Sequence, residues 1–223
     1  MPDKKNNVIL HAVMKKLFVF SLFILCSLAA GARSMAEIWK QMPDSLMPYI
    51  DRNHRNEMVD FLRMGLKGDV DNLFESKSTM DTLTADFIQV RASEALTMQI
   101  KRLPVNNDDS VLCVVRTWLG PSQFSSIQLY SENWQPLQQN ALGTETLSSM
   151  VSRLISRPED MDGQKYEEIK SSFDVLFPCA SLFADNDNLQ LSVSNPNIFE
   201  DQKAYFNQIK GLIILKWNGN IFK

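Results

Sequence analysis

Between residues 37 and 68 the apolar residues recur at intervals of three and four, as they do on amphipathic helices. A short helix is expected from Glu37, and Pro43 interrupts it because proline lacks the amide donor that a helix interior needs. A longer helix is expected from Asn53, ending between Gly65 and Gly68. Its core-facing residues are Met58, Phe61, Leu62 and Leu66, and its solvent-facing residues are Arg55, Glu57, Asp60 and Arg63.

From Asp86 the apolar period changes to two, which is typical of β-strands. Short polar turns separate the apolar runs, including one at residues 104–110. Strands are expected at residues 86–93, 96–101, 110–120 and 125–134. The short connections predict a four-strand antiparallel meander with the two helices laid on one face.

Two of these strands differ in pattern. In residues 96–101 the apolar Leu96, Met98 and Ile100 alternate with polar residues that end at Lys101, as in a half-buried strand with one face in water. Residues 110–120 are apolar on both faces, so we expect an inner strand there.

The second half of the chain repeats the order of helix and strands. Residues 138–163 are polar and form a connection with a short helix at 146–155. A helix around residues 166–176, strands at 179–184 and 188–194, a helix at 200–209 and a strand at 211–217 follow. Asn218–Gly219 signals a closing two-residue hairpin.

The predicted fold class is therefore α+β, with N-terminal helices packed on a mostly antiparallel β-meander and a second, smaller helix-plus-strands half. Residues 33–137 hold the helices and the meander, residues 138–163 the connection, and residues 164–223 the second half, which should share the core.

The N-terminal segment has the features of a secretory signal peptide. Met14 is followed by two lysines and then by an apolar run from Leu17 to Ala32 that ends in small residues. We therefore interpret residues 1–32 as a signal peptide with its true start at Met14, and expect export to the periplasm or the cell envelope. An uncleaved anchor is the second choice, and a lipoprotein is disfavoured because Leu25, rather than a small residue, precedes Cys26.

Charge and composition exclude several classes of function. The formal net charge is −3, and removing the basic N-terminal segment makes the remainder more acidic, which disfavours nucleic acid as a partner. No glycine-rich phosphate loop or dinucleotide fingerprint is present, so no cofactor is expected. Membrane contact is expected only for the signal segment.

Two cysteines follow the signal segment, Cys113 and Cys179. In an oxidising compartment they are a possible disulfide. Both also lie in apolar contexts typical of buried free cysteines, and spacing alone does not fix the geometry that a bridge requires. Both alternatives stay open at the level of sequence.

His54 is the one histidine after the signal segment, in a stretch dense with charge. Sites built on two histidines are therefore excluded, and a histidine-dependent hydrolase would need His54 as its base. No nucleophile motif accompanies it, and the helical spacing around it favours an ordinary helix start. We therefore assign no catalytic residue.

Acidic residues give no metal site and only weak candidates for catalysis. Residues 158–163 resemble the middle of a calcium loop, but Pro158 and Ile169 occupy the two positions that need oxygen ligands. A carboxylate-pair hydrolase stays open, with Asp81 and Asp86 or Glu167 and Glu168 as candidate pairs.

Aromatic residues offer one further kind of surface. On strands they form either core or a groove for a ligand or partner, and core is the commoner outcome. The residues concerned are Trp118, Trp134, Trp217, Tyr130 and Phe222.

Three stretches together resemble an exported Bacteroidales family of unassigned function, domain of unknown function family 3256. They are MPDSLMPYIDRNHRNEMVDFL, KSTMDTLTADFIQVRASEALTMQIKRLPVNNDDSVLCVV and LKWNGNIF. The resemblance spans residues 36–222 and implies a signal peptide, helices, a meander and an aromatic hairpin end. It assigns no catalytic or binding residue.

Because no complete catalytic constellation is present, we expect a non-catalytic binding or interaction module of the cell envelope. Its partner would be an envelope protein or ligand that the sequence does not identify. The alternative is a small carboxylate-pair hydrolase.

Overall fold

The structure, a computed structural model, describes residues 33–105, 109–173, 175–194 and 200–223. The predicted signal peptide and residues 106–108 of the predicted turn lie outside this part. The chain divides into two compact units, Met1–Arg33 and Ser34–Lys223, and all helices and strands below belong to the second. In the described ranges, no helix is long and apolar enough to cross a lipid bilayer.

The N-terminal helices form where the sequence predicts them. Helix α2 (Met35–Lys40) begins at a capping box in which Ser34 and Glu37 exchange side-chain to backbone hydrogen bonds. A short 3-10 turn, η1 (Asp44–Leu46), follows Pro43. Helix α3 (Arg52–Arg63) is capped by Asp51, and the chain leaves it at Gly65, whose φ of 74° suits glycine.

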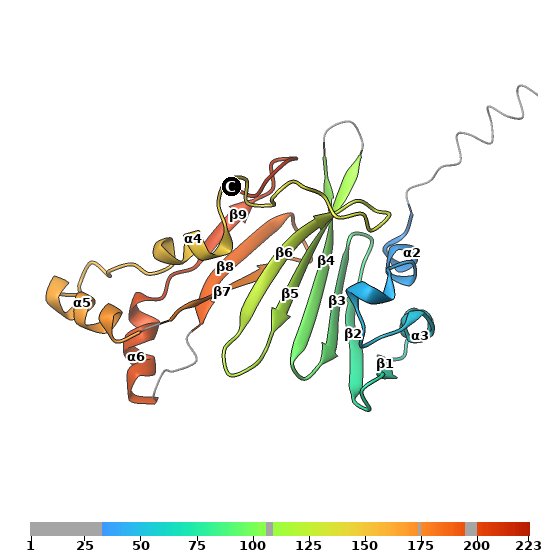
Figure 1. The fold of residues 1–223 in the computed structure, drawn as a ribbon, viewed down its shortest axis with the longest axis horizontal. Helices are drawn as coiled ribbons and strands as arrows, with labels where there is room; N and C mark the ends of the chain where they lie inside the picture. Colours follow the sequence, from blue (N-terminus) through green and yellow to red (C-terminus); the bar gives the residue numbers. More distant parts are fainter. Residues whose placement is uncertain (1–32, 106–108, 174, 195–199) are drawn as a thin grey trace, which may run out of the picture. The chain divides into compact units, whose positions relative to one another are not determined.

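A six-stranded antiparallel meander follows, in the spatial order β1-β2-β3-β4-β5-β6 (Figure 1). Its strands are β1 (Gly68–Asp71), β2 (Lys77–Leu83), β3 (Phe87–Ser93), β4 (Leu96–Pro104), β5 (Ser110–Trp118) and β6 (Phe124–Tyr130). The four predicted strands correspond to β3–β6. The predicted meander was two strands too small, because β1 and β2 bury few apolar side chains and their period is hidden by charged residues.

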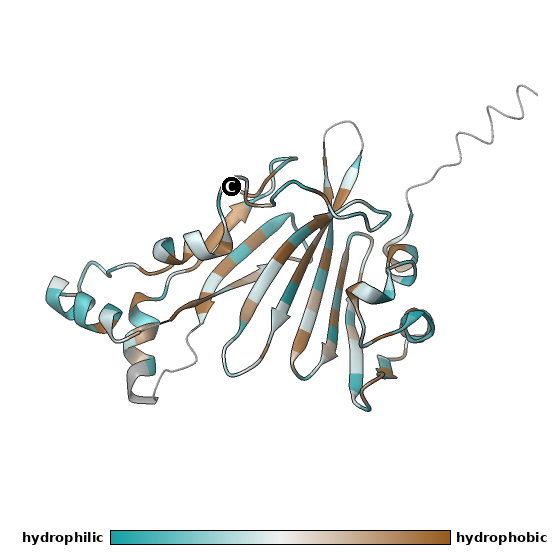
Figure 2. Cartoon of the chain, viewed as in Figure 1, coloured by the Kyte–Doolittle hydropathy of each residue, from teal (hydrophilic) through white to brown (hydrophobic). Residues whose placement is uncertain are grey.

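The two faces of this sheet bury different cores. Alternating apolar and polar bands along β2–β6 are visible in Figure 2. On β5, Leu112 and Val114 pack with α2 and α3, whereas Cys113 and Val115 face the second half of the chain. Burial on both faces confirms that β5 is an inner strand.

In the described residues, the connection and the second half together form four short helices, one of them a 3-10 turn, and a three-stranded antiparallel sheet of order β7-β8-β9 (Figure 1). The helices are α4 (Leu147–Met150), η2 (Val151–Arg153), α5 (Gly163–Ser171) and α6 (Glu200–Ile209), and the strands are β7 (Phe177–Leu182), β8 (Asn188–Ser194) and β9 (Ile213–Lys216). The closing hairpin forms at Asn218–Gly219, where Gly219 has a φ of 91° and Trp217 bridges to Phe222. The α+β fold class is confirmed.

Strand β7 joins the small sheet to the large one through side chains of β4 and β6. The Ala180 N–H donates to Ser125 Oγ over 3.0 Å, and the Leu182 N–H donates to Gln99 Oε1 over 2.8 Å. The second half therefore packs on the face of the large sheet opposite to the N-terminal helices, and residues of that sheet and of the second half together form the second core.

Candidate functional site: the groove between α5 and α6

His54 belongs to the start of α3 and has no catalytic surroundings. Its backbone N–H donates to the N-cap carboxylate of Asp51 over 2.9 Å, and its Nδ1 lies 2.9 Å from the same oxygen. The backbone hydrogen bond from His54 holds the pKa of Asp51 below its ordinary value. The pair caps a helix, as the spacing indicates.

For Arg55, in contrast, the prediction of a solvent-facing side chain was wrong. Its side chain is 1% exposed and donates to the backbone oxygens of Met42 and Ile50, each over 2.6 Å. It also lies 2.7 Å from the carboxylate of Asp44. Arg55 therefore ties the loop between α2 and α3 to the helix, which is a structural role.

The acidic pairs named from the sequence are neutralised by basic neighbours, with one exception. Asp81 lies 2.9 Å from Arg91, and Asp86 lies 2.7 Å from Lys101. Glu167 lies 3.8 Å from Lys170, whereas Glu168 has no basic partner among the described residues. These contacts favour structural roles for Asp81 and Asp86, since an acid–base pair needs two acids in distinct environments.

Cys113 and Cys179 are both free in the structure, so the disulfide left open above does not form in it. Cys113 is fully buried in the second core, and burial raises the pKa of its thiol. The Cys179 thiol donates to Gln123 O over 3.1 Å, and burial also raises its pKa. In the described part of the chain, no group of three His, Cys, Asp or Glu side chains is placed to hold a metal ion.

The aromatic residues named from the sequence pack mostly as core and do not form one groove. Trp134 and Tyr130 are buried in the first core, and Phe222 is buried in the second. Trp118, the last residue of β5, stacks on Phe124, with 4.7 Å between ring centroids. Trp217 is half-buried, and its indole N–H donates to the backbone of β4.

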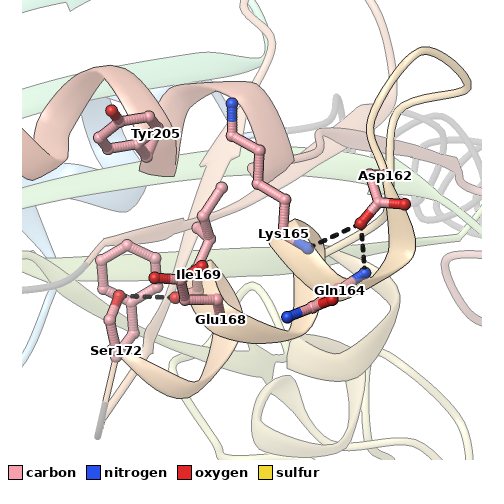
Figure 3. A pocket seen from close by; sticks show the side chains of 8 residues that line it. Asp162, Gln164, Lys165, Glu168, Ile169, Ser172 and Tyr205 are labelled. Carbon is pink, nitrogen blue, oxygen red and sulfur yellow. Dashed lines mark hydrogen bonds between the residues drawn. The ribbon is translucent and has the colours of Figure 1, made fainter.

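A groove of about 560 Å³ lies between α5 and α6, and of its lining residues the sequence had pointed only to Glu168 as a candidate for chemistry (Figure 3). Its volume is in the range of small-molecule sites. Most of its polar residues lie on α5, and an aromatic residue of α6 closes the other side. It is lined by Asp162, Gln164, Lys165, Glu168, Ile169, Ser172, Phe173 and Tyr205.

Asp162 caps the N-terminus of α5. Its carboxylate accepts hydrogen bonds from the backbone N–H groups of Gln164, at 2.8 Å, and Lys165, at 3.2 Å (Figure 3). The bonds from Lys165 and Gln164 hold the pKa of Asp162 below its ordinary value. The Asp162 carboxylate is therefore occupied by the helix cap, and the other polar residues of the groove are the ones available to bind a ligand.

Three side chains on one turn of α5 are open for a ligand. Gln164 and Glu168 are four residues apart, so they lie on the same helix face, and Lys165 lies beside them. Within the described residues, the Gln164 amide and the Glu168 carboxylate make no hydrogen bond or ion pair. The Lys165 ammonium lies 5.5 Å from the ring centroid of Tyr205 and reaches toward α6 in Figure 3.

The sequence predicted both helices but not the groove between them. Tyr205 lies on α6, far from Lys165 in sequence, and no spacing rule joins the two. The one available signal was the weak amphipathicity of α5, whose single buried residue is Ile169 and which is largely hydrophilic in Figure 2. A helix that buries so little leaves most of its side chains available at the surface.

These features define an α+β domain with two antiparallel sheets and a surface groove that combines aromatic and unpaired polar side chains. The chain belongs to the family described as "Protein of unknown function (DUF3256)", whose model matches residues 27–222. This match confirms the resemblance seen in the sequence. Comparison with curated proteins gives no match.

A solved structure shares the fold. It is described as "Structure of a domain of an uncharacterized protein from Porphyromonas gingivalis W83", and it is 20% identical with a TM-score of 0.66. The similarity covers 85% of this chain and 96% of that chain. At this identity the likeness concerns the fold alone.

Proposed function

We propose that the protein is an exported, non-catalytic binding module of the cell envelope that takes its ligand in the α5–α6 groove. The observation that carries the proposal is a groove of ligand size that is lined by the unpaired side chains of Gln164 and Glu168 on α5 and by the aromatic side chain of Tyr205 on α6. Export rests on the signal-like pattern of residues 14–32.

Binding without turnover is supported by the surroundings of the candidate catalytic groups. His54 and Asp51 together cap a helix, and Asp81 and Asp86 are paired with basic side chains. Glu168, the carboxylate without a basic partner, has no second acid of the groove free to work with it, because Asp162 is the helix cap.

The test of binding is residue-resolved NMR of the ¹⁵N-labelled chain. Separate peptide, glycan and lipid fractions of a bacterial cell envelope are added, and amide shifts are followed. We expect shifts in α5 and α6 with at least one fraction, without conversion of that fraction over hours. Glu168→Gln should weaken the response, whereas its neighbour Glu167→Gln should not, because Glu167 is paired with Lys170 and does not line the groove.

Two results would overturn the proposal. One is the absence of groove shifts with all three fractions. The other is the appearance of reaction products that disappear in the Glu168→Gln variant. Export is tested separately by producing the full chain in a Gram-negative host, where we expect a periplasmic protein with its N-terminus near residue 33; a cytoplasmic protein with an intact N-terminus would refute export.

A further inference from the structure

The class of ligand follows from the charges that line the groove. Lys165 carries one positive charge and Glu168 one negative charge, and the Asp162 carboxylate is turned to the backbone of α5. The charges of Lys165 and Glu168, the two open charged groups, therefore cancel. A strongly anionic ligand would be repelled by the carboxylates of Glu168 and Asp162, and a strongly cationic ligand would be repelled by the ammonium of Lys165.

The groove also has an apolar base below a polar rim. Ile169 is buried and Phe173 is half-buried, with the Phe173 ring 5.0 Å from that of Phe206 in the core beneath. Above this base stand an amide, an ammonium and a carboxylate, which together both donate and accept hydrogen bonds. Tyr205 adds a ring that is 45% exposed.

We propose that the groove binds a neutral saccharide, with a sugar ring against Tyr205 and its hydroxyls bonded to Gln164, Lys165 and Glu168. A sugar ring carries C–H groups on its faces and hydroxyls at its edge, which matches an apolar base and aromatic wall below a polar rim. Each hydroxyl both donates and accepts, so it satisfies a carboxylate, an ammonium or an amide. This inference rests on the proposed function and adds the chemical class of the ligand.

Two other classes fit less well. A lipid chain would bury Gln164, Lys165 and Glu168 without hydrogen-bond partners, which is unfavourable. An extended peptide is commonly bound by adding a strand to a sheet edge, and the groove walls are helices whose backbone groups are already paired.

The experiment is a panel of neutral oligosaccharides built from glucose, galactose, mannose, xylose or N-acetylglucosamine. Binding is measured first on an array and then by calorimetry and NMR with the full chain. We expect at least one oligosaccharide to shift amides of α5 and α6. Tyr205→Ala should weaken that binding about tenfold or more, because an exposed ring that packs on a ligand is a typical binding hot spot.

Matched variants separate the groove from the rest of the surface. Lys165→Met and Lys170→Met each remove an ammonium that lies 5.5 Å from a tyrosine ring on this part of the protein, but only Lys165 lines the groove. We expect loss of saccharide binding with the first and not with the second. Phe124→Ala, which removes a partly exposed ring outside the groove, should also leave binding unchanged.

The outcomes distinguish this inference from the proposed function. If a peptide or lipid fraction shifts the groove amides and no neutral oligosaccharide does, the saccharide is refuted and the binding module stands. If an oligosaccharide binds but shifts other surfaces, or binds Tyr205→Ala as well as the native chain, the saccharide site is refuted too. If no fraction and no oligosaccharide shifts the groove, both proposals fall.

Discussion

The ammonium nitrogen of Lys101 lies 2.7 Å from the carboxylate of Asp86, although the Lys101 side chain is only 1% exposed. The same nitrogen donates to the backbone oxygen of Ala184 over 3.1 Å and lies 3.8 Å from Asp187. Lys101 therefore connects β4 of the large sheet to the turn between β7 and β8. Its burial arises because the second half of the chain covers the face of β4 that the sequence pattern places in water.

We expect Asp86→Asn to destabilise the protein by about 2–3 kcal/mol, because it leaves a buried ammonium without its nearest carboxylate. Lys101→Met should be milder, within about 1 kcal/mol, since an apolar chain of similar length fills the site and Asp86 is 45% exposed to water. Urea unfolding of the two variants measures the difference. Equal losses of stability in Asp86→Asn and Lys101→Met would contradict the expectation that removing the carboxylate costs more than removing the ammonium.

The ion pair between Asp86 and Lys101 also predicts that the stability of the protein depends on pH. Burial raises the pKa of Asp86, but hydrogen bonds from Lys101 and Thr84 outweigh it, so the pKa is lower in the folded chain than its ordinary value. The unfolded chain then binds a proton at higher pH than the folded one. The stability from Asp86 is therefore present above the ordinary pKa of an aspartate and is lost as the pH falls through the lowered value.

The measurement is the free energy of unfolding between about pH 6 and about pH 2, for the native chain and for Lys101→Met. We expect the native chain to lose more stability on acidification than the variant, in which Asp86 keeps the hydrogen bonds from Thr84 and from its own backbone but loses Lys101. The lowered pKa values of Asp51 and Asp162 act in both proteins and cancel in the comparison. Parallel pH profiles would show that Lys101 does not hold the pKa of Asp86 down.

Arg55 gives a third prediction. Arg55→Met should destabilise the protein by about 3 kcal/mol, because two buried backbone oxygens lose a charged donor. Arg52→Met, one turn earlier and exposed, is the matched control and should change stability by about 0.5 kcal/mol or less. His54→Gln should be similarly small, since the Asp51 cap retains its bond to the backbone. A large effect of Arg52→Met or His54→Gln would contradict this assignment.

Local periodicity was sufficient for the elements that bury one regular face. Helix α3 follows the spacing of Met58, Phe61 and Leu62, whereas Leu66, also expected in the core, lies past the helix end and is 57% exposed. Strand β8 and helix α6 coincide with the predicted ranges 188–194 and 200–209. Each of these segments carries its signal within a few residues. Periodicity therefore predicted the fold class without information on long-range contacts.

Strands β1 and β2 were missed because their pairing depends on a buried polar residue. The Asn72 amide donates to Ser76, to Ser78 and to the backbone of Ala92, and it holds the turn that joins the two strands. Ser78 faces inward where a strand pattern calls for an apolar residue. A hydropathy period does not detect a strand whose inward positions are satisfied by hydrogen bonds.

Arg55, Lys101 and the α5–α6 groove were missed for a related reason. A charged residue is normally predicted to lie at the surface. Arg55 and Lys101 are buried because oxygen atoms of residues distant in sequence accept their hydrogen bonds. The groove requires α5 and α6 to lie side by side, which neither helix specifies alone. Buried charge and grooves between helices are properties of the tertiary arrangement.

The two cysteines give the last prediction. In the native chain, iodoacetamide should modify Cys179 before Cys113, because Cys179 is partly exposed whereas Cys113 is fully buried in β5. Burial raises the pKa of both thiols, so both should react slowly near neutral pH, and Cys113 more slowly. Peptide mapping by mass spectrometry without reductant measures the two rates, and labelling in denaturant is the control, in which both residues should react alike. If both cysteines resist the reagent in denaturant until a reductant is added, they are bridged, and the free thiols of the structure are contradicted.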